Sequence, residues 1–114
     1  MKTNDAIKAL AALAQATRLD VFRLLVQQGA EGLSASAIAE KLSLPNATLS
    51  FHLKELSQAN LVSARQEGRF IYYAASYPAM NDLVGYLTDN CCGGNDCGVV
   101  CEPVKPSNSK RKSA

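Results

Sequence analysis

The sequence predicts a mainly α-helical (α+β) domain that carries one β-hairpin, and three observations support this fold class. Apolar residues recur at helical spacing in five segments. Two strand-like runs, residues 61–65 and 69–74, flank a turn that contains Gly68. The chain has 114 residues, which is the size of one domain, and a domain this small buries only a modest core alone. We therefore expect five helices, one hairpin and a homodimer.

The first two predicted helices differ in how much of their surface is apolar. Residues 4–15 form a short helix with a narrow apolar stripe, which consists of Ile7, Leu10 and Leu13. This stripe needs a partner surface. In the second helix, Thr17 and Asp20 have the spacing of a capping box, and Gly29 ends the segment. Apolar residues cover most of its circumference, which predicts a central buried helix: Leu19, Val21, Phe22, Leu24, Leu25 and Val26.

A short helix and a longer helix follow, joined by a turn at residues 43–45. Ser34 or Ser36 can cap the short helix, which ends before Pro45. Asn46 is the expected N-cap of the longer helix, residues 47–59, whose apolar stripe is Leu49, Leu53 and Leu56. Asn60 stands where a left-handed residue would end that helix. Two helices joined by a turn of this length indicate a helix-turn-helix.

The remaining elements complete a winged helix-turn-helix. Gly68 can take a positive φ in the turn between the two strand-like arms, so these arms form a hairpin wing. Pro78 can occupy the first turn of a last helix, residues 79–90. Apolar residues recur there at helical spacing: Met80, Leu83, Val84 and Leu87.

Two groups of side chains are suited to contact DNA. The face of the longer helix opposite its leucines, together with its start, offers groups that can meet base edges or phosphates: Asn46, Thr48, Ser50, Phe51, His52 and Lys54. The hairpin tip adds a second set: Arg65, Gln66 and Arg69. Either set can equally be an ordinary solvated surface when taken alone.

The charge pattern and the single histidine limit the function classes. Residues 1–90 carry eight Lys or Arg and eight Asp or Glu, so the formal net charge of +2 comes from residues 91–114. Only the placement of charges can decide whether nucleic acid is a partner. His52 is the only histidine, and no nucleophile and orienting group can be placed around it. We expect no enzyme and no organic cofactor.

The chain has no segment that predicts a membrane partner. No run approaches the roughly 18–20 apolar residues of a membrane span, and the N-terminal segment has too many polar interruptions for a signal peptide. We therefore expect a cytoplasmic protein, in which thiols stay reduced.

The segments LSFHLKELSQANLVSARQEGRFIYY and, upstream, ATRLDVFRLL resemble the ArsR/SmtB family of metal-sensing winged-helix repressors over residues 4–90. The resemblance implies a homodimer formed by the first and last helices. It also implies double-stranded operator DNA with two half-sites as the partner, released when an inducer binds. A symmetric dimer would present its two recognition helices about one DNA turn apart, ~34–36 Å.

The sequence departs from the family at both of its usual effector sites. Arsenic sensors of the best-known type have a C-x-C in the helix before the recognition helix, but residues 34–42 contain no cysteine. Zinc sensors of the family use Asp and His ligands on the final helix, but residues 79–90 contain no histidine. Any effector site must therefore lie in the cysteine cluster.

All four cysteines lie in residues 91–101. A subset of arsenical repressors carries a vicinal cysteine pair after the last helix and a third cysteine several residues on. Cys91, Cys92 and Cys97 resemble that arrangement, and Cys101 is an additional candidate ligand. Trivalent arsenic and antimony are soft and favour three thiolates. The resemblance thus implies As(III) or Sb(III) as the inducer.

Two other readings of the cluster stay open. Four cysteines can complete a tetrahedral zinc, cadmium or lead site, although paired C-x-x-C knuckles are absent. A thiol-redox-sensing regulator is the second alternative, although it commonly uses a C-x-x-C at a helix N-terminus.

The expected organisation has three parts: a winged helix-turn-helix DNA-binding and dimerisation domain at 1–90, a metalloid-binding segment at 91–101, and a disordered basic tail at 102–114. Consecutive residues of a regular helix do not face one another. We therefore expect ligand binding by Cys91 and Cys92 to unwind or fix the end of the last helix.

Overall fold

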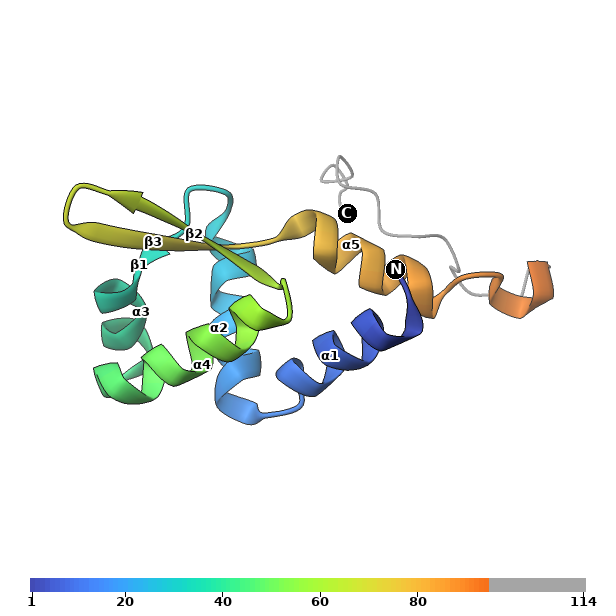
Figure 1. Cartoon of the computed structure of the whole chain (residues 1–114), viewed down its shortest axis with the longest axis horizontal. Helices are drawn as coiled ribbons and strands as arrows, with labels where there is room; N and C mark the ends of the chain where they lie inside the picture. Colours follow the sequence, from blue (N-terminus) through green and yellow to red (C-terminus); the bar gives the residue numbers. More distant parts are fainter. Residues whose placement is uncertain (95–114) are drawn as a thin grey trace.

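The computed structural model describes residues 1–94 and contains the five expected helices and the hairpin (Figure 1). The predicted ligands Cys97 and Cys101 and the predicted basic tail lie outside the described residues. The elements are α1 (Thr3–Leu13), α2 (Ala16–Gln28), β1 (Leu33–Ser34), α3 (Ala35–Leu42), α4 (Asn46–Gln58), β2 (Val62–Glu67), β3 (Phe70–Ala75), α5 (Tyr77–Leu87) and a short 3₁₀ turn (Cys91–Gly94). This architecture is a winged helix-turn-helix.

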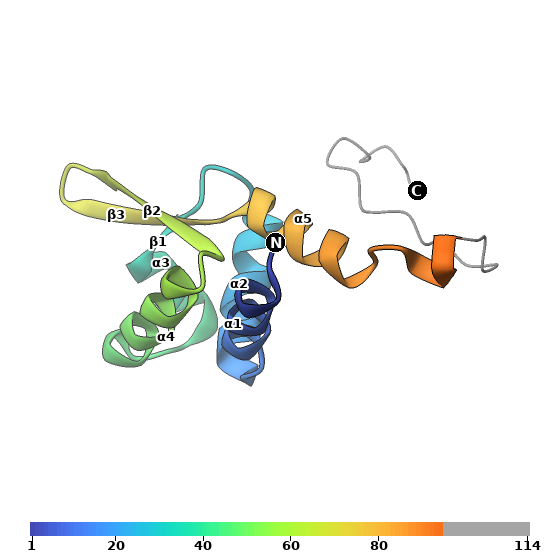
Figure 2. The same cartoon turned by 45° about the vertical axis from the view of Figure 1, so that its right-hand side comes forward.

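The wing is part of a three-stranded antiparallel sheet with the order β1-β3-β2. β2 and β3 pair from Val62 opposite Ala75 to Glu67 opposite Phe70, and Gly68 takes a φ of 63° in the turn. The predicted positive φ at Gly68 is therefore confirmed. The hairpin tip projects away from the helices (Figures 1 and 2).

Strand β1 was not expected from the sequence. It has only two residues, with Leu33 opposite Tyr73 of β3. Gly32 precedes it with a φ of 76°, and a Cβ at this position would collide with the backbone carbonyl of Tyr73. A glycine is thus required for the chain to approach β3 closely enough to pair.

The core lies where one face of α1 meets α2, α3, α4 and the base of the sheet, and Leu83 of α5 joins it. Its fully buried side chains include Val21, Leu25, Ile38, Leu49, Leu56 and Leu61. Helix α2 buries only one face, through Val21, Phe22 and Leu25, whereas Leu19 is 41% exposed. Helix α2 is central as predicted, because it contacts α1, α4 and β3, but only one of its sides is buried, since in so small a domain other elements do not cover the rest of the helix.

The helix termini follow the expected chemistry at some positions and not at others. The Ser34 hydroxyl accepts from the Ala37 backbone N–H at 3.2 Å and caps α3, and Asn60 adopts the left-handed conformation with a φ of 63°. Both predictions are confirmed. The predicted capping box is wrong, because α2 begins at Ala16 and its N-cap is Gln15, whose side chain accepts from the Arg18 backbone N–H at 2.8 Å.

Asn46 is also not an N-cap. Helix α4 begins at this residue, and the extended Pro45 occupies the N-cap position without a side-chain cap. The Pro45 carbonyl accepts the Leu49 N–H at 3.0 Å, so the helical hydrogen bonding starts one residue earlier than predicted.

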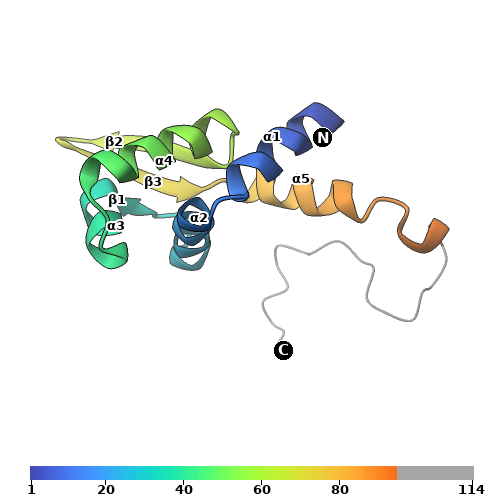
Figure 3. The same ribbon diagram turned by 90° about the horizontal axis from the view of Figure 1, so that it is seen from below.

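Helices α1 and α5 lie next to each other at the end of the molecule opposite the wing tip (Figures 1 and 3). The hydroxyl groups of Thr3 and Tyr86 are 2.7 Å apart and join the two helices. The Tyr77 hydroxyl donates to the Val26 carbonyl at 2.8 Å and ties the start of α5 to α2. None of the helices in residues 1–94 has the length and apolar character that crossing a membrane requires.

Candidate nucleic-acid interface and thiol segment

The exposed face of α4 carries five of the side chains predicted to meet DNA. Leu49, Leu53 and Leu56 bury the opposite face. The five exposed residues of the set are Asn46, Thr48, Ser50, Phe51 and Lys54. They combine hydroxyl and amide groups, a cation and an aromatic ring that is 55% exposed. These groups can hydrogen-bond to base edges, neutralise a phosphate and contact a thymine methyl group.

His52 does not belong to this exposed set. Its side chain is only 7% exposed, and its Nδ1 lies 3.3 Å from the Arg18 Nη1. Burial is the main reason that the pKa of His52 lies below its ordinary value of 6.5, and the charge of Arg18 is the second. The carboxylate of Glu55 acts in the opposite direction and raises the pKa. The prediction that His52 faces outward is therefore wrong. It stands three residues after Leu49 and four before Leu56, which is the spacing of the buried stripe.

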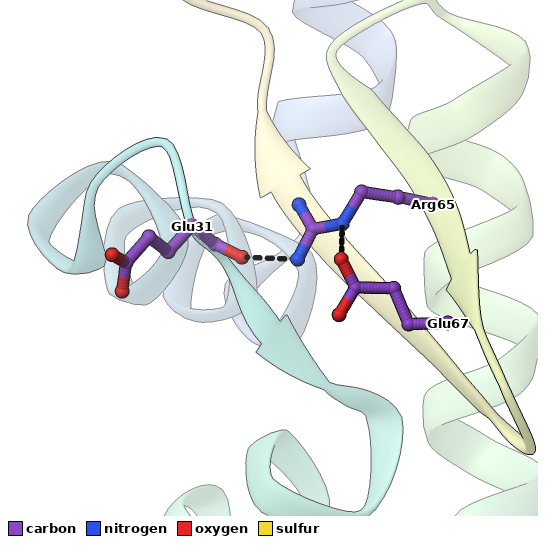
Figure 4. A network of polar contacts seen from close by, with 3 residues as sticks. All are labelled: Glu31, Arg65 and Glu67. Atoms are coloured by element: carbon purple, nitrogen blue, oxygen red, sulfur yellow. Dashed lines mark hydrogen bonds and ion pairs between the residues drawn. The ribbon is translucent and has the colours of Figure 1, made fainter.

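Arg65, predicted to reach DNA from the wing, is engaged within the chain (Figure 4). Its Nε donates to the Glu67 carboxylate at 2.7 Å, and its Nη2 donates to the Glu31 carbonyl at 3.3 Å. The guanidinium also lies 5.3 Å from the centre of the Tyr72 ring. These contacts connect the wing to the loop before β1 and offset the charge of Arg65.

The other two predicted wing residues lie at the tip. The Gln66 side-chain amide donates to the Gly68 carbonyl at 3.3 Å across the turn. Arg69 is exposed beside Gly68 and, within residues 1–94, makes no hydrogen bond or ion pair. Arg69 is thus the wing arginine whose charge is available to a partner.

The wing tip and the start of α4 point to the same end of the molecule in three views (Figures 1, 2 and 3). Helix α4 also contacts β2 directly. One extended partner can therefore contact both the start of α4 and the wing tip.

The two described cysteines lie beyond the last helix. Helix α5 ends at Leu87, and Cys91 and Cys92 belong to the following 3₁₀ turn, where Cys92 has a φ of 57°. The last helix therefore ends three residues before the predicted 90, and the expectation that ligand binding unwinds or fixes this end stays a prediction. The left-handed conformation of Cys92 brings the two sulfur atoms to 3.7 Å from each other.

This sulfur separation is suited to a shared ligand. Two thiolates at about 2.3 Å from one tetrahedral ion are themselves about 3.8 Å apart, close to the 3.7 Å between the Cys91 and Cys92 sulfurs. Cys92 is disulfide-bonded in the structure, so ligand binding by its thiolate requires prior reduction. Residues 1–94 contain no group of three or more His, Cys, Asp or Glu side chains that could hold a metal ion.

Comparison with known proteins supports the assignment of the fold to DNA-binding regulators. A helix-turn-helix domain family matches residues 13–64. The nodulation protein NolR of Rhizobium meliloti is 38% identical over 80 residues, which cover 70% of this chain and 63% of NolR. The chain thus spans less than two thirds of that relative's length. The transcriptional repressor SdpR of Bacillus subtilis strain 168 is 30% identical over 84 residues, which cover 74% of this chain and 87% of SdpR.

Solved structures give the same result. An ArsR-like transcriptional regulator from Rhodococcus sp. RHA1 superposes with a TM-score of 0.66 at 28% identity, covering 74% of this chain and 76% of the other. The homodimeric winged helix-turn-helix domain of a possible ArsR-family regulator from Mycobacterium bovis has a TM-score of 0.63 at 27% identity. The match covers 81% of this chain and 85% of that domain. A possible transcriptional regulator for arsenical resistance has a TM-score of 0.62 at 28% identity, and the match covers 70% of this chain and 80% of the other. By sequence and fold, the chain belongs to the helix-turn-helix transcriptional regulators, and the solved structures that it resembles include ArsR-like and possible ArsR-family members.

Proposed function

We propose that this regulator is a homodimeric repressor that binds operator DNA through α4 and the wing and leaves it when As(III) or Sb(III) binds the C-terminal thiolates. The observation that carries the DNA-binding part is that the start of α4, with its exposed polar side chains, and the wing tip, which carries the exposed Arg69, lie at the same end of the molecule. Lys54 and Arg69 neutralise phosphates, whereas Thr48 and Ser50 meet base edges. Arg65 contributes by holding the wing in place.

An apolar surface on α1 and α5 supports a homodimer. Ile7 and Leu10 on α1, and Tyr86 and Leu87 on α5, are each at least one third exposed, with Ile7 at 56% and Leu87 at 58%. The two helices contact each other, and large apolar side chains grouped on adjoining elements are typical of an interaction surface. The Mycobacterium bovis domain of the same fold is homodimeric. Two copies joined here would place the start of α4 and the wing tip of each copy away from the interface.

The inducer proposal rests on the thiol pair. Cys91 and Cys92 lie 3.7 Å apart, a spacing at which both sulfurs can bind one soft ion after reduction. Cys97 provides the third thiolate, and Cys101 is an additional candidate. One structural neighbour is described as a possible regulator of arsenical resistance, which favours the same class of effector here.

A redox-sensing function is the second candidate, and the disulfide at Cys92 favours it. In that case, oxidation alone would release the DNA. A zinc, cadmium or lead site is the third, because the sulfur spacing also fits a tetrahedral metal.

One titration separates these functions. Reduced, tag-free protein is bound to fluorescent promoter DNA in a thiol-free reductant, and the anisotropy is followed with arsenite, antimonite, methylarsenite, zinc and cadmium side by side. The proposal expects release by the trivalent metalloids at the lowest concentrations. Release by zinc or cadmium at lower concentrations would favour the metal site. Release by mild peroxide, with none by metalloid, would establish the redox function instead.

A further inference from the structure

Arg18 connects the end of α1 to the recognition helix α4. Its Nε donates to the Ala12 carbonyl at 2.8 Å, which is one of the last carbonyls of α1 and has no partner within that helix. Its Nη1 lies 3.3 Å from Nδ1 of His52 on α4. The backbone of Arg18 is itself fixed, because its N–H donates to the Gln15 side chain at 2.8 Å.

The chemistry of this contact fixes the position of the proton on His52. A guanidinium has five N–H donors and no acceptor. The Nδ1 atom of His52 can therefore form this hydrogen bond only as an acceptor, so the neutral ring carries its proton on Nε2. Protonation of Nδ1 would remove the acceptor and bring two cations into contact.

The charged groups around the ring do not cancel this repulsion. Helix α2 contributes Arg18, and α4 contributes Glu55, which favours the protonated ring but has a smaller effect than burial or Arg18. Lys8 of α1 lines a cavity of about 580 Å³ together with Arg18 and Glu55, and adds a further positive charge to this region. The Phe51 ring meets the imidazole edge-on at 5.5 Å and brings no charge.

We propose that the Arg18–His52 contact positions the recognition helix and makes operator affinity sensitive to pH, with neutral His52 holding α4 against the end of α1. This inference rests on the proposed DNA-binding role of α4. His52 is a positioning residue here, since it acts through the placement of Thr48, Ser50 and Lys54 on the exposed face of the same helix.

The sign of the effect follows from the lowered pKa of His52. The folded chain binds fewer protons than the unfolded chain, so the stability that this group contributes is complete above the ordinary value of 6.5 and is lost as the pH falls through the lowered pKa of the folded state. Operator affinity should decrease in the same direction, because α4 is then less firmly placed.

NMR of the imidazole nitrogens tests the contact without DNA. His52 is the only histidine of the chain, so protein without a histidine tag gives a single set of ring signals. The expected result is the Nε2–H tautomer with a pKa below 6.5, and a higher pKa in Arg18→Gln, which keeps a donor but removes the charge. The Nδ1–H tautomer, or a pKa of His52 that Arg18→Gln leaves unchanged, would overturn the proposal.

Operator titrations across pH test the function of the contact. His52→Asn is the matched variant, because its amide oxygen can accept from Arg18 but does not titrate. As the pH falls from 7.5, the affinity of the unchanged protein should decrease relative to the variant and reach about a tenfold difference once the NMR titration shows His52 protonated, the order expected for losing a hydrogen bond to a charged group. Thermal unfolding at each pH verifies that both proteins remain folded.

Parallel pH profiles of the two proteins would overturn the positioning role. If the unchanged protein failed to bind promoter DNA even at pH 7.5, the proposed function would fail instead, while the NMR result would still decide the contact.

Discussion

Replacing Arg69 by Ala should weaken operator binding in a salt-dependent way, whereas replacing Arg65 should not. Arg69 makes no ion pair or hydrogen bond within residues 1–94, so its charge is free to meet a phosphate. Arg65 is already bound to Glu67 and to the Glu31 carbonyl. The two substitutions remove the same charge from neighbouring parts of one hairpin, so each is a control for the other.

The size of the effect follows from counterion release. A dimer has two wings, so Arg69→Ala removes two phosphate contacts, and the slope of log affinity against log salt should become shallower by about 1.8. Over a fourfold change in salt, the ratio of the two affinities should change about twelvefold, so the proteins differ most at low salt. Arg65→Ala should leave the slope nearly unchanged and lower the stability by about 0.2–1 kcal/mol, as for an exposed ion pair.

The assay is fluorescence anisotropy on promoter DNA at four salt concentrations between about 50 and 200 mM. Thermal unfolding of each variant tests whether the wing remains folded. Equal slopes for Arg69→Ala and the unchanged protein would remove Arg69 from the interface. If Arg65→Ala changed the slope of log affinity against log salt more than Arg69→Ala, the assignment of Arg69 as the DNA-contacting arginine and Arg65 as the arginine bound within the chain would be refuted.

Four further substitutions test the fold and the assembly. Leu56→Ala removes a fully buried side chain and should lower the free energy of unfolding by about 2–5 kcal/mol in denaturant titrations; a loss below 1 kcal/mol would contradict its place in the core. Gly32→Ala should destabilise the pairing of β1 with β3, because the new methyl group meets the Tyr73 carbonyl, and faster amide exchange at Tyr73 would report this loss. Ile7→Asp and Leu87→Asp, each on the exposed apolar surface, should yield monomers in light scattering at concentrations where the unchanged protein is dimeric; two dimeric variants would place the interface elsewhere.

Helical periodicity and turn residues were sufficient to predict most of the fold. Leu49, Leu53 and Leu56 are buried as their spacing indicated. Asn60 and Gly68 have positive φ angles because their residue types tolerate that conformation better than others. These signals are local, so they can be recognised without knowledge of the tertiary structure.

Features that depend on long-range contacts were missed. Strand β1 has two residues and exists only because β3 pairs with it. Gln15 caps α2 although glutamine is not a preferred N-cap residue. The engagement of Arg65 depends on Glu31, which is 34 positions away in the sequence.

The position of His52 could have been predicted. Residues 49, 52, 53 and 56 share one helical stripe, so the periodicity alone placed the ring on the buried side. Its polar character suggested a DNA contact instead, since a buried histidine requires a partner such as Arg18 that only the tertiary structure brings near.

The most direct test of the inducer site compares the reduced protein with a Cys91→Ser, Cys92→Ser double variant on fluorescent promoter DNA. Both should bind the DNA with equal affinity, because the 3₁₀ turn lies outside α4 and the wing. Arsenite should release the unchanged protein and leave the double variant bound. Equal release of both proteins by arsenite would contradict the central claim that this thiol pair is the inducer site.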